Sequence, residues 1–215
     1  NDLHGPIDVA AAWSKESQCY LVVYRDEEKC YARAVKFESA FGLVFLTNEK
    51  FVTNLPYGSY MKLAAAKNGK FILFIHDGTN LSAIALNDDG KIFKPLKALT
   101  QYVGGDFYVG GVDREGKKTV AYVLFTPDGA AQSTLSMIKV NNKLSKVQTK
   151  HVATMANPGA YFAFFGKYDP DGRLHAAIVG EKFCTFRKNG RNVMAMANLP
   201  TQHPAKDLCY DPVNQ

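Results

Sequence analysis

Long hydrophobic runs are missing from this sequence of 215 residues. No apolar stretch approaches the roughly 20 residues that a helix needs to cross a bilayer, so no membrane span is predicted. An initiating methionine is also missing: the chain starts "NDLHGP", as expected of a mature product whose signal peptide has been removed, or of a recombinant chain. Helical periodicity is almost absent, which favours an all-β structure.

Sequence motifs of common catalytic sites are missing too. There is no GxSxG, no HExxH and no glycine loop that would cradle a phosphate. The five histidines are scattered, and His76 with Asp77 is better interpreted as a turn after a buried strand than as an acid–base pair. We therefore expect a protein that is not an enzyme, with no catalytic residues to name.

Cysteine is scarce, with Cys19, Cys30, Cys184 and Cys209 as the only four. None forms a CxxC pair, which argues against a structural zinc site. Two disulfides are conceivable: Cys19 with Cys30 on adjacent strands, or Cys209 bonded back to the first part of the chain. These bonds and the "NLS" sequon at Asn80 favour a secreted, extracellular protein; the alternative is four buried thiols inside a cell.

A repeat dominates what is present. Similar segments begin at Val9, Leu63, Val109 and Phe162, and each combines small residues, a polar turn and a strongly apolar run. The turns lie about 50 residues apart, a period typical of propellers and other repeat folds. Each unit then continues with two further strand-like segments, the last of which is the more polar.

Four units of four antiparallel strands predict an all-β, four-bladed β-propeller as a single domain over residues 1–215. The predicted blades cover 7–53, 54–102, 103–155 and 156–200, followed by a closing tail at 201–215. Alanine triplets at 10–12 and 64–66 belong to the first strand of their blades. Small side chains there would let neighbouring inner strands approach one another near the axis.

Repeat length, strand number and possible ring closure make residues 7–209 similar in architecture to the hemopexin-type domain. That family also has four blades of about this length and a bond between the first and last blades. The resemblance implies a closed ring, and the aromatic strand motif typical of the family is not evident in this sequence.

One loop of the last unit resembles the calcium loop of integrin-type propellers. In "FGKYDPDGRLH", Asp169, Asp171 and Gly172 match that pattern, whereas Lys167 and His175 occupy two of its ligand positions. Calcium takes six or more oxygen ligands, so we expect a turn here and no cofactor, with a calcium or tunnel cation bound at Asp169 and Asp171 as the alternative.

Charge is the clearest functional signal. The formal net charge is +6, which favours anionic partners. Basic residues recur around the last strand of three units, and lysines at such edges also prevent aggregation. The functional hypothesis is a basic rim for ligand binding, comprising Lys91, Lys94, Lys97, Lys143, Lys146, Lys150, Arg187, Lys188 and Arg191.

The partner predicted for this rim is an anionic glycan or an extracellular protein. Nucleic acid is disfavoured because no stacking motif of a known reader is present. Two other functions stay open: a carrier that holds a small ligand or cation in a central tunnel, and a hydrolase with acids gathered at the tunnel mouth.

Overall fold

The computed structural model describes residues 8–40, 42–56, 58–101, 107–112, 117–125, 131–156, 162–163, 174–179, 182–187 and 193–198. Every regular element in these ranges is a β-strand, and all strand pairs are antiparallel. No helix that could span a bilayer occurs among them. The prediction of an all-β chain is therefore confirmed.

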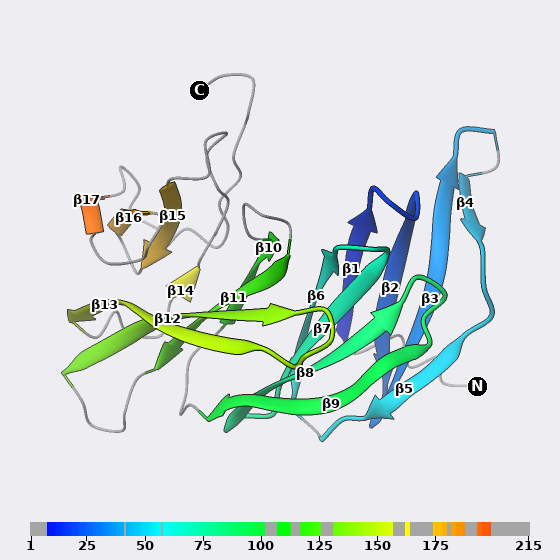
Figure 1. Cartoon of the computed structure of the whole chain (residues 1–215), viewed down its shortest axis with the longest axis horizontal. Coiled ribbons are helices and arrows are strands. Elements are labelled where there is room, and N and C mark those ends of the chain that lie inside the picture. The colour runs from blue at the N-terminus through cyan, green and yellow to red at the C-terminus, as the bar shows by residue number, and fades with distance from the viewer. Residues whose placement is uncertain are drawn as a thin grey trace.

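The strands form four consecutive sheets, A to D (Figure 1). Sheet A has the order β1-β2-β3-β4, and β5 also pairs with β3. Its strands are β1 (Asp8–Ser14), β2 (Cys19–Asp26), β3 (Lys29–Glu38), β4 (Gly42–Phe45) and β5 (Lys50–Asn54). The outermost position is thus shared by two short strands.

Sheets B, C and D each contain four strands in chain order. Sheet B consists of β6 (Tyr60–Ala66), β7 (Lys70–His76), β8 (Asn80–Asn87) and β9 (Ile92–Gln101). Sheet C consists of β10 (Phe107–Val112), β11 (Lys118–Phe125), β12 (Gln132–Asn141) and β13 (Val147–Ala156). Sheet D consists of β14 (Phe162–Ala163), β15 (Leu174–Val179), β16 (Lys182–Arg187) and β17 (Val193–Asn198).

Strand β7 shows how the sheets pack face to face. Successive side chains of a strand point to opposite faces, and here both faces are buried. Phe71 and Leu73 join the core between sheets A and B, whereas Ile72 and Phe74 join the core between sheets B and C. A continuous apolar run is the sequence signature of such a doubly covered strand.

The alanine triplets pack at these same junctions. Ala10 and Ala12 of β1 pack against the A–B core, as does Ala65 of β6, while Ala66 belongs to the B–C core. Small side chains thus let the inner strands β1, β6 and β10 lie next to one another. Ala11 differs, because it faces solvent on the far side of sheet A.

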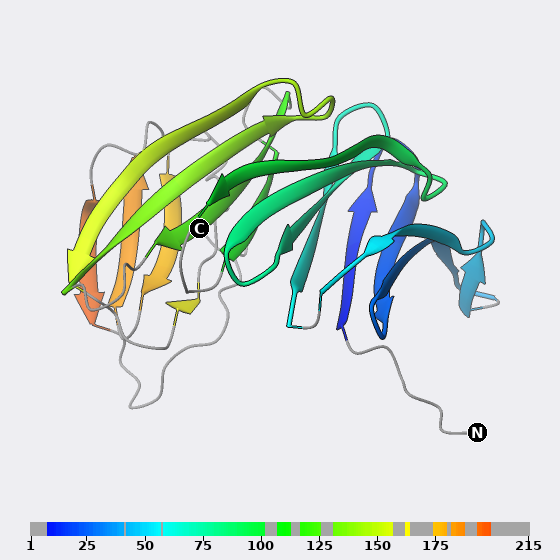
Figure 2. The same ribbon diagram turned by 90° about the horizontal axis from the view of Figure 1, so that it is seen from below.

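The sheets form an open arc, and the predicted closed wheel has to be corrected. Sheets A and D lie at opposite ends of the molecule (Figures 1 and 2). Strand spacing in a sequence determines how many sheets form, but packing at each junction decides the angle between them. The blade boundaries and the predicted closing tail stay predictions, and residues 199–215 lie outside the described ranges.

The predicted disulfides of the first unit are absent. Cys19 and Cys30 are free thiols buried in the A–B core, and the Cys30 thiol contacts the Met61 sulfur at 3.6 Å. Burial, reinforced by the negative charge of Asp8, raises the pKa of Cys30 to about 12. The side chains of Cys184 and Cys209 lie outside the described part of the chain.

Candidate functional site

Two of the three predicted basic groups come together where sheets B and C meet. Strand β9 supplies Lys94 and Lys97, and the β12–β13 turn and β13 supply Lys143, Lys146 and Lys150. The Lys97 ammonium donates a hydrogen bond to the carbonyl oxygen of Leu144 at 2.6 Å. Five of the nine residues of the predicted rim thus lie at this junction, and these five form the basic rim of the structure: Lys94, Lys97, Lys143, Lys146 and Lys150.

The turn is built to hold these lysines outward. The side-chain oxygen of Asn141 accepts hydrogen bonds from the amides of Ser145 and Lys146, at 2.9 and 3.1 Å. Leu144 is buried in the B–C core with a φ of 53°. Because the core anchors Leu144 and Asn141 closes the turn, Lys143 and Lys146 are left exposed on either side.

The rim lysines differ in whether their ammonium groups already contact other groups of the protein. Lys94 lies 5.3 Å from the centre of the Phe93 ring, a cation–π contact. Lys91, which was also predicted for the site, instead pairs with Asp89 at 3.1 Å. No hydrogen bond or ion pair to the ammonium groups of Lys143, Lys146 or Lys150 is made by the residues that the structure describes.

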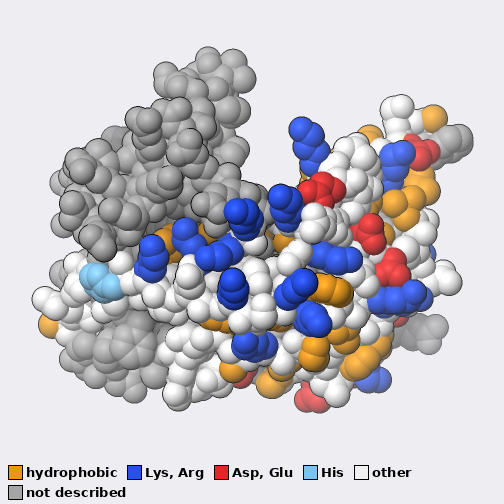
Figure 3. Space-filling view, in the orientation of Figure 1, with side chains coloured by type: hydrophobic (Ala, Val, Ile, Leu, Met, Phe, Trp, Pro, Cys, Tyr) orange, Lys and Arg blue, Asp and Glu red, His pale blue; other side chains and the backbone are white. Residues whose placement is uncertain are grey.

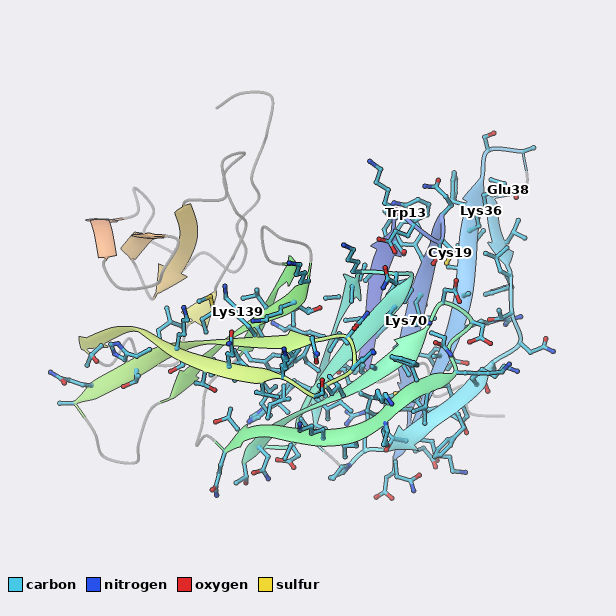
Figure 4. The ribbon with its side chains drawn as sticks, viewed as in Figure 1. Trp13, Cys19, Lys36, Glu38, Lys70 and Lys139 are labelled. Atoms are coloured by element: carbon cyan, nitrogen blue, oxygen red, sulfur yellow. The ribbon has the colours of Figure 1, made fainter. Side chains whose placement is uncertain are left out.

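The sequence around the rim lysines contains no aspartate or glutamate. The sequence from 90 to 105 contains three lysines and neither aspartate nor glutamate, and the sequence from 129 to 168 contains five lysines and no acid. Figure 3 shows Lys and Arg side chains concentrated over β9, β12 and β13, and Figure 4 labels a further lysine of β12, Lys139. A surface of one sign raises the local concentration of anions.

The other predicted site residues are not tested. The side chains of Arg187, Lys188 and Arg191 lie outside the described residues, as do Asp169 and Asp171. Among the described residues no cluster of His, Cys, Asp or Glu could hold a metal ion.

A second feature, which sequence reasoning missed, lies between the β1–β2 and β6–β7 hairpins. A shallow pocket of about 300 Å³ opens there, next to Trp13 at the end of β1 (Figure 4). We call it the hairpin pocket, lined by Trp13, Ser14, Lys15, Glu16, Ala65, Ala66 and Lys67. The sequence feature that could have indicated this pocket is Trp13, the single tryptophan of the chain, because it directly follows an alanine triplet.

Two carboxylates lie near Gly69, and one of them, Glu16, lines this pocket. Glu16 accepts a hydrogen bond from the Gly69 amide at 2.7 Å, and Asp88 accepts one from the Ser17 hydroxyl at 3.1 Å. Asp88 also lies 3.6 Å from the position that a Cβ on Gly69 would occupy. The hairpin turn thus brings together acids from sheets A and B that are 72 positions apart in numbering.

His76 and Asp77 follow one another at the end of β7 but lie in different surroundings, since His76 is buried and Asp77 is exposed. His76 is buried and stacks on Tyr60, with ring centroids 6.3 Å apart. The Asp77 carboxylate accepts hydrogen bonds from the amides of Thr79 and Asn80, at 3.0 and 2.7 Å. Partial burial works to raise the pKa of Asp77, but these hydrogen bonds outweigh it and the pKa is lowered. The interpretation of Asp77 as a turn residue agrees with this geometry.

Solved structures are similar to this chain at low sequence identity. The luciferin-regenerating enzyme matches with a TM-score of 0.50 and 11% identity, over 87% of this chain and 61% of that one. The endo-arabinase from Bacteroides thetaiotaomicron matches with a TM-score of 0.46 and 12% identity, over 88% of this chain and 72% of that one. The Cps50 (Swd1) β-propeller domain from Myceliophteria thermophila matches with a TM-score of 0.44 and 9% identity, over 89% and 73%.

The succession of antiparallel sheets packed face to face is similar in fold to the luciferin-regenerating enzyme, the match with a TM-score of 0.50, and a propeller of four blades stays a prediction. No family model matches the chain, and no curated protein matches it. The hemopexin-type part of the predicted resemblance is therefore not confirmed. The chain spans about three fifths of the luciferin-regenerating enzyme, 61% of its length.

The expectation that this protein is not an enzyme was wrong. It rested on missing sequence motifs, but the luciferin-regenerating enzyme has the same type of fold at 11% identity. An enzyme can therefore have this type of fold without a recognisable sequence motif, and the absence of such motifs does not support the expectation. Function depends on the residues of a site and not on the fold.

Proposed function

We propose that this protein binds an anionic glycan, with sulphate or carboxylate groups, along the basic rim. The main observation behind the proposal is that lysines of sheets B and C lie together where Lys97 donates a hydrogen bond to the Leu144 carbonyl. The sequence on either side of these lysines contains no aspartate or glutamate. A polymer with regularly spaced anions matches a row of lysines better than a compact ligand does.

The spacing of the free lysines suits several simultaneous contacts. Lys146 and Lys150 are four residues apart, and a strand rises about 3.3 Å per residue, so their Cα atoms are separated by roughly 13 Å. Exposed ion pairs contribute only about 0.2–1 kcal/mol each. Useful affinity therefore requires several lysines together, and it must fall as salt is added. The proposal also fits the prediction of a secreted protein, because such glycans are abundant outside cells.

The test compares two double variants of equal charge on immobilised heparin. Lys143→Gln/Lys146→Gln removes two exposed rim lysines, and Lys29→Gln/Lys36→Gln removes two exposed lysines of sheet A. We expect the rim variant to elute at clearly lower NaCl and to bind about tenfold more weakly, and the control to behave as wild type. Equal weakening in both variants would show that only net charge matters, and the proposal would fail.

Hydrolysis of the bound glycan is a second candidate, favoured by the carboxylates Glu16 and Asp88 beside the hairpin pocket. Trp13 supplies an aromatic wall of that pocket, and both carboxylates are held as hydrogen-bond acceptors. Paired carboxylates are the groups that most glycoside hydrolases use.

Release of new reducing ends from a glycan that binds the rim would support this second candidate. The activity should be lost in Glu16→Gln and in Asp88→Asn, while both variants still bind heparin. Activity that survives both substitutions would exclude this pair of acids.

A further inference from the structure

One face of sheet A carries large apolar side chains that point into solvent. Strand register places them together: Trp13 lies opposite Tyr20, and Val9 opposite Tyr24, while Tyr31 lies opposite Phe51. We call this the aromatic face. It comprises Val9, Ala11, Trp13, Tyr20, Val22, Tyr24, Tyr31, Arg33, Val35, Phe37, Leu43, Phe45 and Phe51.

The rings of this face form two ladders across the strands. Trp13 and Tyr20 have their ring centroids 4.8 Å apart. In the other ladder Tyr31 lies between Tyr24 and Phe51, at 5.9 and 6.0 Å. Contacts of this kind hold the rings in place and leave a continuous apolar surface.

Its single charged side chain is already engaged within the face. The Arg33 guanidinium lies 3.7 Å from the centre of the Phe45 ring, and its Nε donates to the Thr47 carbonyl at 2.8 Å. Covering the face would therefore not leave this charge without a partner.

The aromatic face is the equivalent of a face that another sheet covers elsewhere in the molecule. In sheet B, Phe71 pairs with Ala65 and Leu86, just as Tyr20 pairs with Trp13 and Val35 in sheet A. That face of sheet B is covered by sheet A, and both Phe71 and Leu86 are 0% exposed. Sheet A thus has the same kind of face that another sheet covers in sheet B, but in sheet A its large side chains are exposed.

The exposed area is large for a monomer. Trp13, Tyr20, Phe45 and Phe51 are 41%, 40%, 54% and 52% exposed, and four such rings together present on the order of 400 Å². Apolar patches beyond a few hundred Å² mark interaction surfaces. Figure 3 shows hydrophobic side chains gathered over β4 and β5.

We propose that the aromatic face is covered by the same face of a second copy of this chain, so that the two sheets A pack on each other in a symmetric dimer. A four-stranded sheet covers roughly 20 Å by 20 Å. With its irregular side-chain surface, that area approaches the roughly 800 Å² per partner of a standard interface.

A second copy is the occupant that the arrangement favours. Sheet D lies at the opposite end of the arc from sheet A, and sheet B is already packed on both faces. The aromatic face of a second copy has the same size and the same apolar side chains, so two such faces can cover each other. Most soluble oligomers are built from identical chains.

The test measures mass and Trp13 fluorescence over a range of concentration, with two variants that add the same charge. Phe51→Lys changes the aromatic face, and Leu96→Lys changes a residue of β9 with nearly equal exposure, 52% against 53%. Trp13 is the only tryptophan of the chain, so without a ligand in the hairpin pocket its emission reports on whether this face is covered.

We expect sedimentation equilibrium to give twice the chain mass of 23.7 kDa, with a blue shift of Trp13 emission as the dimer forms. Phe51→Lys should weaken the dimer at least tenfold, and Leu96→Lys should leave it unchanged. A monomer at all concentrations would overturn the proposal. Trp13 emission typical of an exposed ring would then show that the face is open, and emission typical of a buried ring would show that the same chain covers it. A dimer that Phe51→Lys does not weaken would also overturn it.

Discussion

Lys97 and Leu144 join two sheets at the edge of the molecule. The ammonium group of Lys97, in β9, donates to the carbonyl oxygen of Leu144 at 2.6 Å, and the Leu144 side chain is buried in the core between sheets B and C. One contact therefore links the packing of the junction to the position of the basic rim.

Substitution of Lys97 by Gln should lower the free energy of unfolding by about 1.5 kcal/mol, because the carbonyl of Leu144 loses a charged donor. Urea denaturation at neutral pH measures the change. Lys91→Gln is the control, since the Lys91 side chain is 66% exposed and pairs with Asp89 at the surface. That control should lie within about 0.5 kcal/mol of wild type, and a similar loss in both variants would contradict the prediction.

Gly90 should tolerate alanine less well than Gly78. Both glycines have positive φ, 84° and 91°, so alanine is strained at either position. A Cβ at Gly90 would also lie 3.2 Å from Ala32 of sheet A, whereas at Gly78 it would meet nothing within 4 Å. We expect Gly90→Ala to cost about 1 kcal/mol more than Gly78→Ala.

Thermal or urea unfolding of the two glycine variants gives this difference directly, since the strain from positive φ is common to both. Equal destabilisation would mean that β3 shifts at no cost, and that sheets A and B are packed less tightly than Gly90 and Ala32 indicate.

Cys30 should make stability fall at alkaline pH. Its native pKa is raised to about 12 by burial, so above pH 9 the unfolded chain loses this proton while the native protein keeps it. The native state is then disfavoured by about 1.4 kcal/mol for each pH unit between roughly 9 and 12. Urea titrations at pH 8 and pH 10 should show a smaller drop for Cys30→Ala than for wild type. An identical drop would contradict the raised pKa.

Asp77 should stabilise the native state only while it is charged. Its pKa is lowered because the amide hydrogen bonds outweigh its partial burial, so the stabilisation is present above the ordinary pKa near 4 and is lost as pH falls through the native value. Asp77→Ala should cost about 1 kcal/mol at pH 7. The gap between variant and wild type should narrow at pH 2.5. A gap that is constant with pH would show that the carboxylate charge contributes nothing.

Local patterns predicted the elements well. Alternating and continuous apolar runs located the strands around Leu21, Phe71 and Val120, and polar turns such as that at Gly69 marked the hairpins between them. These features depend on neighbours along the chain, so periodicity and turn chemistry suffice to recognise them.

The candidate site was predicted only in part. Basic spacing pointed to Lys97 and Lys143, but their association depends on a hydrogen bond between two sheets, which no linear pattern encodes. The hairpin pocket was missed because Glu16 and Asp88 belong to different sheets. Cys19 and Cys30 lie on adjacent strands, but Cys30 lies opposite Arg25, six residues along β2 from Cys19, so the two thiols do not meet.

The sequence by itself determined an all-β chain of repeated antiparallel sheets, because strand pairing follows from local alternation and short turns. Only the tertiary structure decided that the sheets form an open arc, that the lysines of sheets B and C meet, and that an aromatic face is left uncovered. The physical reason is that angles between sheets come from side-chain packing at each junction, where residues distant in the chain meet.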